Sequence, residues 1–109
     1  MQHLAIYPGT FDPPTLGHLD VAERASRLFN QIIIAVGVNS AKSPLLSVEE
    51  RVEALKLATS HLSNVRIDSF SGLLVEYTKQ QGARSIIRGL RATQDFEYEF
   101  QIALANRRL

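Results

Sequence analysis

The sequence predicts an α/β fold of the Rossmann-like type, a doubly wound parallel sheet in which four strands alternate with helices. Short β-branched runs alternate with longer amphipathic stretches four times along the 109 residues. One of the short runs, residues 31–38, is apolar along nearly its whole length, as expected of a parallel strand covered on both faces. The connections are short, and this order of elements favours right-handed crossovers. We therefore expect a single domain spanning residues 1–109.

Short apolar runs mark the expected strands. They are rich in β-branched residues, and each ends at a breaker or a polar residue, which is typical of strands in α/β domains. The first run stops at Pro8-Gly9, and the last continues into Arg88-Gly89. The expected strands are residues 3–7, 31–38, 65–68 and 85–87.

Apolar residues at helical spacing mark the segments between the strands. Behind the loop 9–17, apolar positions recur three and four residues apart among charged ones. Ser47 and Glu50 have the spacing of a capping box at the start of a second helix, and Gly82 ends a third helix over residues 72–81. A fourth helix is expected from about residue 95 to residue 109.

Composition excludes several classes of function. The 12 Lys+Arg and 11 Asp+Glu leave a formal charge of +1, which provides no basic face for a nucleic-acid backbone, and we expect no nucleic-acid partner. The sequence has no Cys, which excludes disulfides, thiolate nucleophiles and Cys-ligated metals. It has neither a basic-then-apolar leader nor an apolar run of the roughly 20 residues that cross a bilayer. We expect a cytoplasmic protein with no membrane partner.

Cations cluster at one edge of the predicted sheet. Open parallel sheets bind ligands outside the carboxyl ends of their strands, where the strand order reverses. With the common order 3-2-1-4, the loop 9–18 faces the loop 88–91 across that point. Lys42, Arg88 and Arg91 follow strands at the same edge. Clustered cations on a nearly neutral chain favour a small polyanionic ligand, and phosphates are the obvious candidates.

The loop 9–18 carries no G-x-G-x-x-G or G-x-x-x-x-G-K-[ST] phosphate motif. Its glycines nevertheless allow a close approach of the backbone to a ligand, and it opens directly into a helix whose N-terminus attracts phosphate. His18, in the first helical turn, adds an imidazole donor. Asp12 precedes Pro13-Pro14 and is interpreted as a turn-former rather than a metal ligand.

Three sequence motifs follow one another along the chain, each at the end of an expected element: P-G-T-F-D-P-P-T-L-G-H-L-D, R-G-L-R and D-F-E-Y-E-F-Q. Together they closely resemble the bacterial phosphopantetheine adenylyltransferase family, within the T/H-x-G-H nucleotidyltransferases, and the resemblance runs along the whole chain. It implies transfer of an adenylyl group from ATP to 4'-phosphopantetheine, giving dephospho-coenzyme A and pyrophosphate without a covalent enzyme intermediate. It also implies Mg²⁺ arriving on the ATP phosphates, coenzyme A as a related ligand, and a homohexamer.

The resemblance assigns roles to individual residues. His18 matches the family histidine that contacts ATP and stabilises the transition state. The positions that match ATP contacts are Thr10, Phe11 (through its backbone), His18, Gly89, Leu90, Arg91 and Glu99. The positions that match 4'-phosphopantetheine contacts are Thr10, Lys42, Leu74 and Arg88. Leu74 equally fits the apolar stripe of the third helix, and Glu99 taken alone resembles a solvated helix charge.

Two alternatives remain open at this stage. One is another T/H-x-G-H nucleotidyltransferase, for instance one that acts on nicotinate mononucleotide. The other is a nucleotide-binding, oligomerising but non-catalytic fragment. The family pattern continues beyond residue 109 with a further strand and a serine-rich motif, so we expect the domain to be truncated at its C-terminus. The expected fourth helix is apolar on two sides, which is consistent with a subunit contact.

Overall fold

The computed structural model describes residues 3–38, 44–89 and 96–99, and it contains a sheet of order β3-β2-β1-β4-β5. The elements are β1 (Leu4–Gly9), α1 (Leu16–Ser26), β2 (Gln31–Gly37), α2 (Val48–Ala58), β3 (Val65–Phe70), α3 (Leu74–Gln81), β4 (Ser85–Gly89) and β5 (Phe96–Glu99). The first four strands are parallel to one another. The predicted Rossmann-like alternation is therefore confirmed, and the first four strands have the common order 3-2-1-4.

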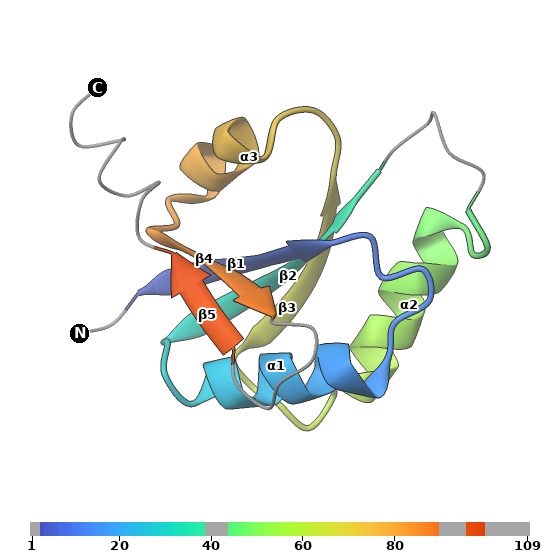
Figure 1. Ribbon diagram of the computed structural model, residues 1–109, viewed down its shortest axis with the longest axis horizontal. Helices are drawn as coiled ribbons and strands as arrows, with labels where there is room; N and C mark the ends of the chain where they lie inside the picture. The colour runs from blue at the N-terminus through green and yellow to red at the C-terminus, as the bar shows by residue number, and fades with distance from the viewer. Residues whose placement is uncertain (1–2, 39–43, 90–95, 100–109) are drawn as a thin grey trace.

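The helices cover both faces of this sheet. Helices α1 and α2 lie on one face and α3 lies on the other (Figure 1). The chain steps outward from β1 to β2 and β3 through α1 and α2, and α3 then carries it back past β1 to β4. Parallel crossovers are right-handed as a rule, and this rule places α3 on the opposite face once the direction reverses. The predicted double winding is thus present.

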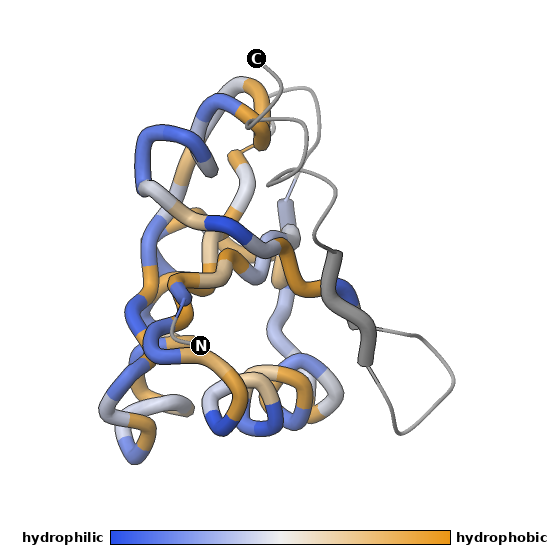
Figure 2. The backbone as a smooth tube through the Cα atoms, turned by 90° about the vertical axis from the view of Figure 1, so that its left-hand side faces the viewer, coloured by the Kyte–Doolittle hydropathy of each residue, from blue (hydrophilic) through white to orange (hydrophobic). Residues whose placement is uncertain are grey.

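Alternation along the strands divides the core into two clusters. Tyr7 and Ile34 belong to the cluster under α1 and α2, whereas Ile6 and Ile33 belong to the cluster under α3. Successive strand residues face opposite sides of a sheet, so an apolar run supplies both clusters at once. Figure 2, which looks nearly along α1, shows hydrophobic residues on the side toward the sheet and hydrophilic residues on the far side.

The predicted helix over residues 95–109 is wrong for residues 96–99. These residues form β5, which pairs antiparallel with β4. Their sequence, Phe-Glu-Tyr-Glu, alternates aromatic and acidic residues with the period of a strand, and aromatic residues favour strands. The edge of β4 offers hydrogen-bonding partners for such a segment. The rest of the predicted helix lies outside the described residues.

Helix boundaries follow the local signals closely. Ser47 caps α2 with the predicted capping box, and Gly82 ends α3 in the left-handed conformation with φ 74°. Among the helices of the described ranges, none is long and apolar enough to cross a lipid bilayer.

Candidate functional site

The carboxyl end of β1 lies where the strand order reverses. Strand β1 pairs with β2 on one side and with β4 on the other, and the helices that follow β1 and precede β4 cover opposite faces. This is the place at which open α/β sheets bind ligands. The loop from Thr10 to Thr15 and the end of β4 at Gly89 meet this edge. These two segments therefore border the candidate site.

Phe11 anchors the loop after β1. Phe11 is 2% exposed, and its ring makes an edge contact with the ring of Tyr7 at a centroid distance of 5.4 Å. Phe11 has a φ of 53°, which few non-glycine residues adopt. A Cβ on Gly9 would lie 3.0 Å from the Phe11 ring, so a larger residue there would push the ring out of its place. The buried ring thus fixes the conformation of the loop backbone around it.

His18 is held by a capping box at the start of α1. The backbone N–H of Thr15 donates to Nδ1 of His18 at 2.9 Å, and the N–H of His18 donates to Oγ1 of Thr15 at 3.3 Å. Because Nδ1 accepts a hydrogen bond, the neutral ring carries its proton on Nε2. Burial also lowers the pKa of His18 below its usual value. The ring is therefore a neutral imidazole with a fixed tautomer and an Nε2–H donor.

The His18 ring also rests on Phe11. Their centroids lie 4.8 Å apart at an interplanar angle of 70°, an edge-to-face arrangement. The sequence predicted His18 as a helix N-terminal donor, and this position is confirmed. What the structure adds is that the anchored Phe11 ring and the Thr15 cap together fix the imidazole.

Asp12 holds the segment that precedes α2. Its two carboxylate oxygens accept hydrogen bonds from the backbone N–H groups of Leu45 and Leu46, each at 2.8 Å. The interpretation of Asp12 as a turn-former missed this long-range contact. The peptide bond from Asp12 to Pro13 is cis. The carboxylate is committed to backbone amides, and no group of residues in the described ranges has the composition of a metal site.

Arg51 connects α2 to the same loop. Arg51 is 3% exposed, and its Nη1 donates to the carbonyl oxygen of Thr10 at 2.9 Å. Its Nε donates to the carbonyl oxygen of Ser47 at 3.3 Å. Arg51 is not among the site residues predicted from the sequence. The signal that could have found it is its place four residues before Leu55, on the buried side of the predicted helix.

Comparison with known families identifies the family of the chain. A family model described as cytidylyltransferase-like matches residues 6–109. The chain belongs to the cytidylyltransferase-like family.

Relatives of this cytidylyltransferase-like chain bear the name that its motifs predicted. It is 58% identical over 106 residues to the phosphopantetheine adenylyltransferase of Heliobacterium modesticaldum, covering 97% of the chain and 63% of that protein. It is 54% identical over 106 residues to that of Desulforudis audaxviator, covering 97% of the chain and 65% of that protein. The predicted resemblance is confirmed, and the chain spans slightly less than two thirds of the length of these relatives.

Solved structures share the fold. A lipopolysaccharide core biosynthesis protein from Thermoplasma volcanium matches with a TM-score of 0.60 at 16% identity, covering 77% of this chain and 71% of the other. A bifunctional NMN adenylyltransferase/ADP ribose pyrophosphatase from Francisella tularensis, complexed with AMP and a manganese ion, matches with a TM-score of 0.56 at 22% identity. The match covers 74% of this chain and 25% of the Francisella protein. At these identities the likeness supports the fold alone.

The other predicted site residues of the cytidylyltransferase-like chain fall into three groups. Thr10 and Arg88 are exposed at the predicted edge, and Gly89 ends β4 there. Glu99 ends β5 instead of lying on a helix. Lys42, Leu90 and Arg91 lie outside the described residues.

Leu74 lies at the start of α3, on the opposite face of the sheet from α1. It is half-buried and packs against the cluster that contains Tyr77, which agrees with the apolar stripe expected of the third helix. The Tyr77 hydroxyl donates to Oδ2 of Asp68 at 2.6 Å, and its ring stacks on Phe70 with centroids 4.9 Å apart. Burial, followed by the contact with Asp68, raises the pKa of Tyr77. These contacts fix α3 at the end of β3.

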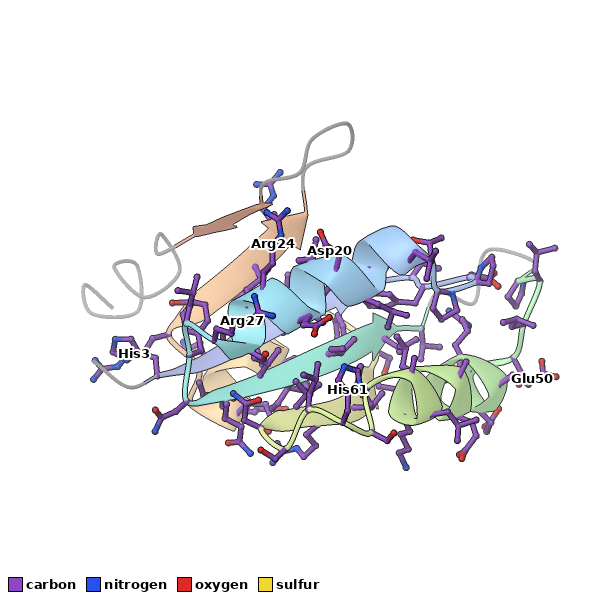
Figure 3. All side chains as sticks on the ribbon, turned by 90° about the horizontal axis from the view of Figure 1, so that it is seen from below. His3, Asp20, Arg24, Arg27, Glu50 and His61 are labelled. Atoms are coloured by element: carbon purple, nitrogen blue, oxygen red, sulfur yellow. The ribbon has the colours of Figure 1, made fainter. Side chains whose placement is uncertain are left out.

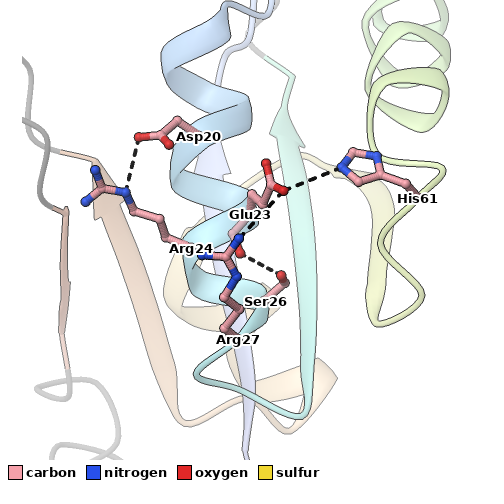
Figure 4. A network of polar contacts seen from close by, with 6 residues as sticks. All are labelled: Asp20, Glu23, Arg24, Ser26, Arg27 and His61. Atoms are coloured by element: carbon pink, nitrogen blue, oxygen red, sulfur yellow. Dashed lines mark hydrogen bonds and ion pairs between the residues drawn. The ribbon is translucent and has the colours of Figure 1, made fainter.

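The outer side of α1 carries ion pairs that are separate from the site. Arg24 lies 3.3 Å from Asp20, and Arg27 and His61 lie 3.8 and 3.9 Å from the same oxygen of Glu23 (Figure 4). Figure 3 shows His61 reaching toward α1 from the segment after α2. Exposed pairs of this kind contribute little to stability. His61 is thus an exposed surface residue.

Proposed function

We propose that the protein transfers the adenylyl group of ATP to 4'-phosphopantetheine, with dephospho-coenzyme A and pyrophosphate as products. The observation that carries the proposal is the neutral His18 imidazole, fixed by Thr15 and Phe11 at the edge where the strand order reverses. The identity of 54% to a phosphopantetheine adenylyltransferase, and of 58% to another, supports this choice of substrates.

The reaction needs one bond formed and one broken. A phosphate oxygen of 4'-phosphopantetheine attacks the α-phosphorus of ATP, and the bond from that phosphorus to the α–β bridging oxygen breaks. Pyrophosphate leaves with the electron pair. Negative charge builds on the non-bridging oxygens of the α-phosphate, and the Nε2–H of His18 donates a hydrogen bond there. One preorganised donor of this kind stabilises a transition state by about 3–4 kcal/mol.

The surroundings of His18 suit this role. Its lowered pKa and the amide donor on Nδ1 keep the ring neutral near pH 7, so the proton stays on Nε2. The N-terminus of α1 adds a positive potential at the same place. Thr10 and the Phe11 backbone contact ATP in this proposal. Lys42 and Arg88 bind the phosphate of 4'-phosphopantetheine.

The remaining partners follow from the same proposal. Mg²⁺ arrives on the ATP phosphates, which suits a loop whose nearest carboxylate, Asp12, already accepts two amides. Coenzyme A binds as a relative of the product, and the protein acts in the cytoplasm as a homohexamer. Light scattering should then give a mass well above that of one chain, and a clean monomer at micromolar concentration would contradict the hexamer.

The decisive experiment measures pyrophosphate release from ATP with 4'-phosphopantetheine or nicotinate mononucleotide as acceptor. We expect turnover with 4'-phosphopantetheine only, and a loss of about 10²- to 10³-fold in kcat for His18→Ala. His61→Ala is the matched control, because His61 is an exposed histidine whose described contact is with Glu23. Turnover with nicotinate mononucleotide alone would refute the acceptor. ATP binding without any turnover would favour a non-catalytic role.

A further inference from the structure

Two side chains outside the proposed substrate contacts connect the loop after β1 to the start of α2. Asp12 accepts from the amides of Leu45 and Leu46, and Arg51 donates to the carbonyl of Thr10. These bonds join positions 33 to 41 residues apart in the sequence. In both cases the loop supplies the acceptor and the α2 side supplies the donor, but the side chain comes from the loop in one case and from α2 in the other. The loop is therefore held at two adjacent points.

Burying the charge of Arg51 costs more free energy than a purely structural contact requires. Arg51 is 3% exposed, and within the described part of the chain its hydrogen-bond partners are two carbonyl oxygens, with no carboxylate at ion-pair distance. Burying a charge without a counter-charge costs free energy, and an apolar side chain of similar volume often serves stability equally well. The position of the charge therefore calls for a role other than packing.

The peptide unit between Thr10 and Phe11 supplies that role. A peptide bond is planar and trans, so a donor fixed on the Thr10 carbonyl also fixes the direction of the Phe11 N–H, which points the opposite way. That N–H forms no hydrogen bond with the described residues. A charged donor on the carbonyl also polarises the N–H and makes it a stronger donor.

We propose that Arg51 and Asp12 are positioning residues for ATP. Arg51 orients and polarises the Phe11 N–H toward a phosphate oxygen, and Asp12 keeps the loop against α2 so that this geometry exists before ATP binds. The inference rests on the proposed function in one respect only, namely that the nucleotide lies at the loop after β1. It does not depend on the acceptor being 4'-phosphopantetheine.

The test is the affinity for Mg²⁺-ATP alone, measured by calorimetry on Arg51→Met and on the matched control Arg66→Met. Both variants lose one positive charge, but Arg66 is exposed on β3 and its described side-chain contact is Gln81. We expect Arg51→Met to weaken ATP binding about 10-fold and Arg66→Met to change it less than about 2-fold. Arg51→Lys, which keeps the charge and can reach one carbonyl, should restore part of the loss.

Two further measurements separate positioning from folding. The free energy of unfolding of Arg51→Met should not fall, because the variant removes a buried unpaired charge. Asp12→Asn should also weaken ATP binding, and the double variant should lose less than the product of the two single losses, because both residues hold one loop. Multiplicative losses, or an Arg51→Met variant that loses stability but binds ATP normally, would overturn the inference.

The outcomes also distinguish this inference from the proposed function. If ATP binding follows the expected pattern but 4'-phosphopantetheine is not adenylylated, the acceptor is wrong and the positioning role stands. If the wild-type protein turns over while Arg51→Met binds ATP as the wild type does, the positioning role is wrong and the proposed function stands. A wild-type chain that binds no ATP refutes both.

Discussion

Helices α1 and α2 begin with the same local motif but with different chemistry. In each, the N-cap hydroxyl accepts from the backbone N–H three residues later, and the side chain at that later position accepts from the N-cap N–H. In α2 this side chain is the Glu50 carboxylate, which lies at the outer end of the helix (Figure 3). In α1 it is the His18 imidazole, packed against Phe11.

The difference shows what the histidine adds. A carboxylate in the first turn of a helix interacts favourably with the helix dipole, and glutamate is the usual partner in a capping box. A neutral imidazole gives up that charge interaction. In exchange, the cap on Nδ1 leaves the proton on Nε2, so a motif that stabilises α2 also prepares a donor in α1.

The largest expected effect comes from replacing His18 by glutamine, with Glu50→Gln as the matched single variant. Glutamine can still complete a capping box at either position. His18→Gln should lower kcat for pyrophosphate release by about 10²- to 10³-fold while the free energy of unfolding changes by less than about 0.5 kcal/mol. Glu50→Gln should change neither quantity appreciably. The comparison fails if His18→Gln keeps a near wild-type kcat, or if Glu50→Gln loses as much activity.

Removing the two N-cap hydroxyls should give equal losses of stability and unequal losses of activity. Thr15→Ala and Ser47→Ala should each lower the free energy of unfolding by about 1 kcal/mol, measured by urea titration. Thr15→Ala should also lower kcat about 10-fold, because the His18 ring loses one of its holding contacts. Ser47→Ala should leave kcat unchanged. Equal effects of both variants on kcat would show that the α1 cap has no special role.

The capping boxes and the strands are local features, and that is why the sequence could predict them. The all-apolar run of β2, the Ser47–Glu50 pair and the left-handed Gly82 each depend on neighbours within a few residues. Residues 96–99 show the limit of this reasoning, because their spacing fits both a helix and a strand over so short a length. Pairing with β4 decides between the two.

The site was predictable only in part. His18, Thr10 and Phe11 could be singled out as candidates because the loop after β1 carries a recognisable motif in front of a helix. Arg51 and the acceptor role of Asp12 depend on contacts between segments 33 to 41 residues apart, which no local pattern reveals. The tautomer of His18 likewise required the geometry of the Thr15 amide.

The pH dependence of stability should also differ between the two helix starts. Burial lowers the pKa of His18 below its ordinary value of 6.5, so between these two values the unfolded chain binds more protons than the folded one. The contribution of His18 to stability is therefore complete above about pH 6.5 and is lost as the pH falls toward the lowered pKa. Urea titrations at several pH values should show this decline in the free energy of unfolding of Glu50→Gln. The decline should be smaller in His18→Gln, which lacks the imidazole. Identical slopes in the two variants would contradict it.

The smallest expected effect concerns α3, whose start lacks a side-chain cap. Its N-cap residue, Leu73, is 71% exposed and has extended dihedral angles of φ −78° and ψ 133°, which suit a capping serine. Glu76 already stands three residues later, so Leu73→Ser reproduces the spacing of Ser47 and Glu50. We expect a gain of about 0.5–1 kcal/mol in the free energy of unfolding relative to Leu73→Ala. If no gain appears, the capping boxes of α1 and α2 owe their stability to tertiary contacts, and the Phe11 ring rather than the Thr15 cap becomes the main support of His18.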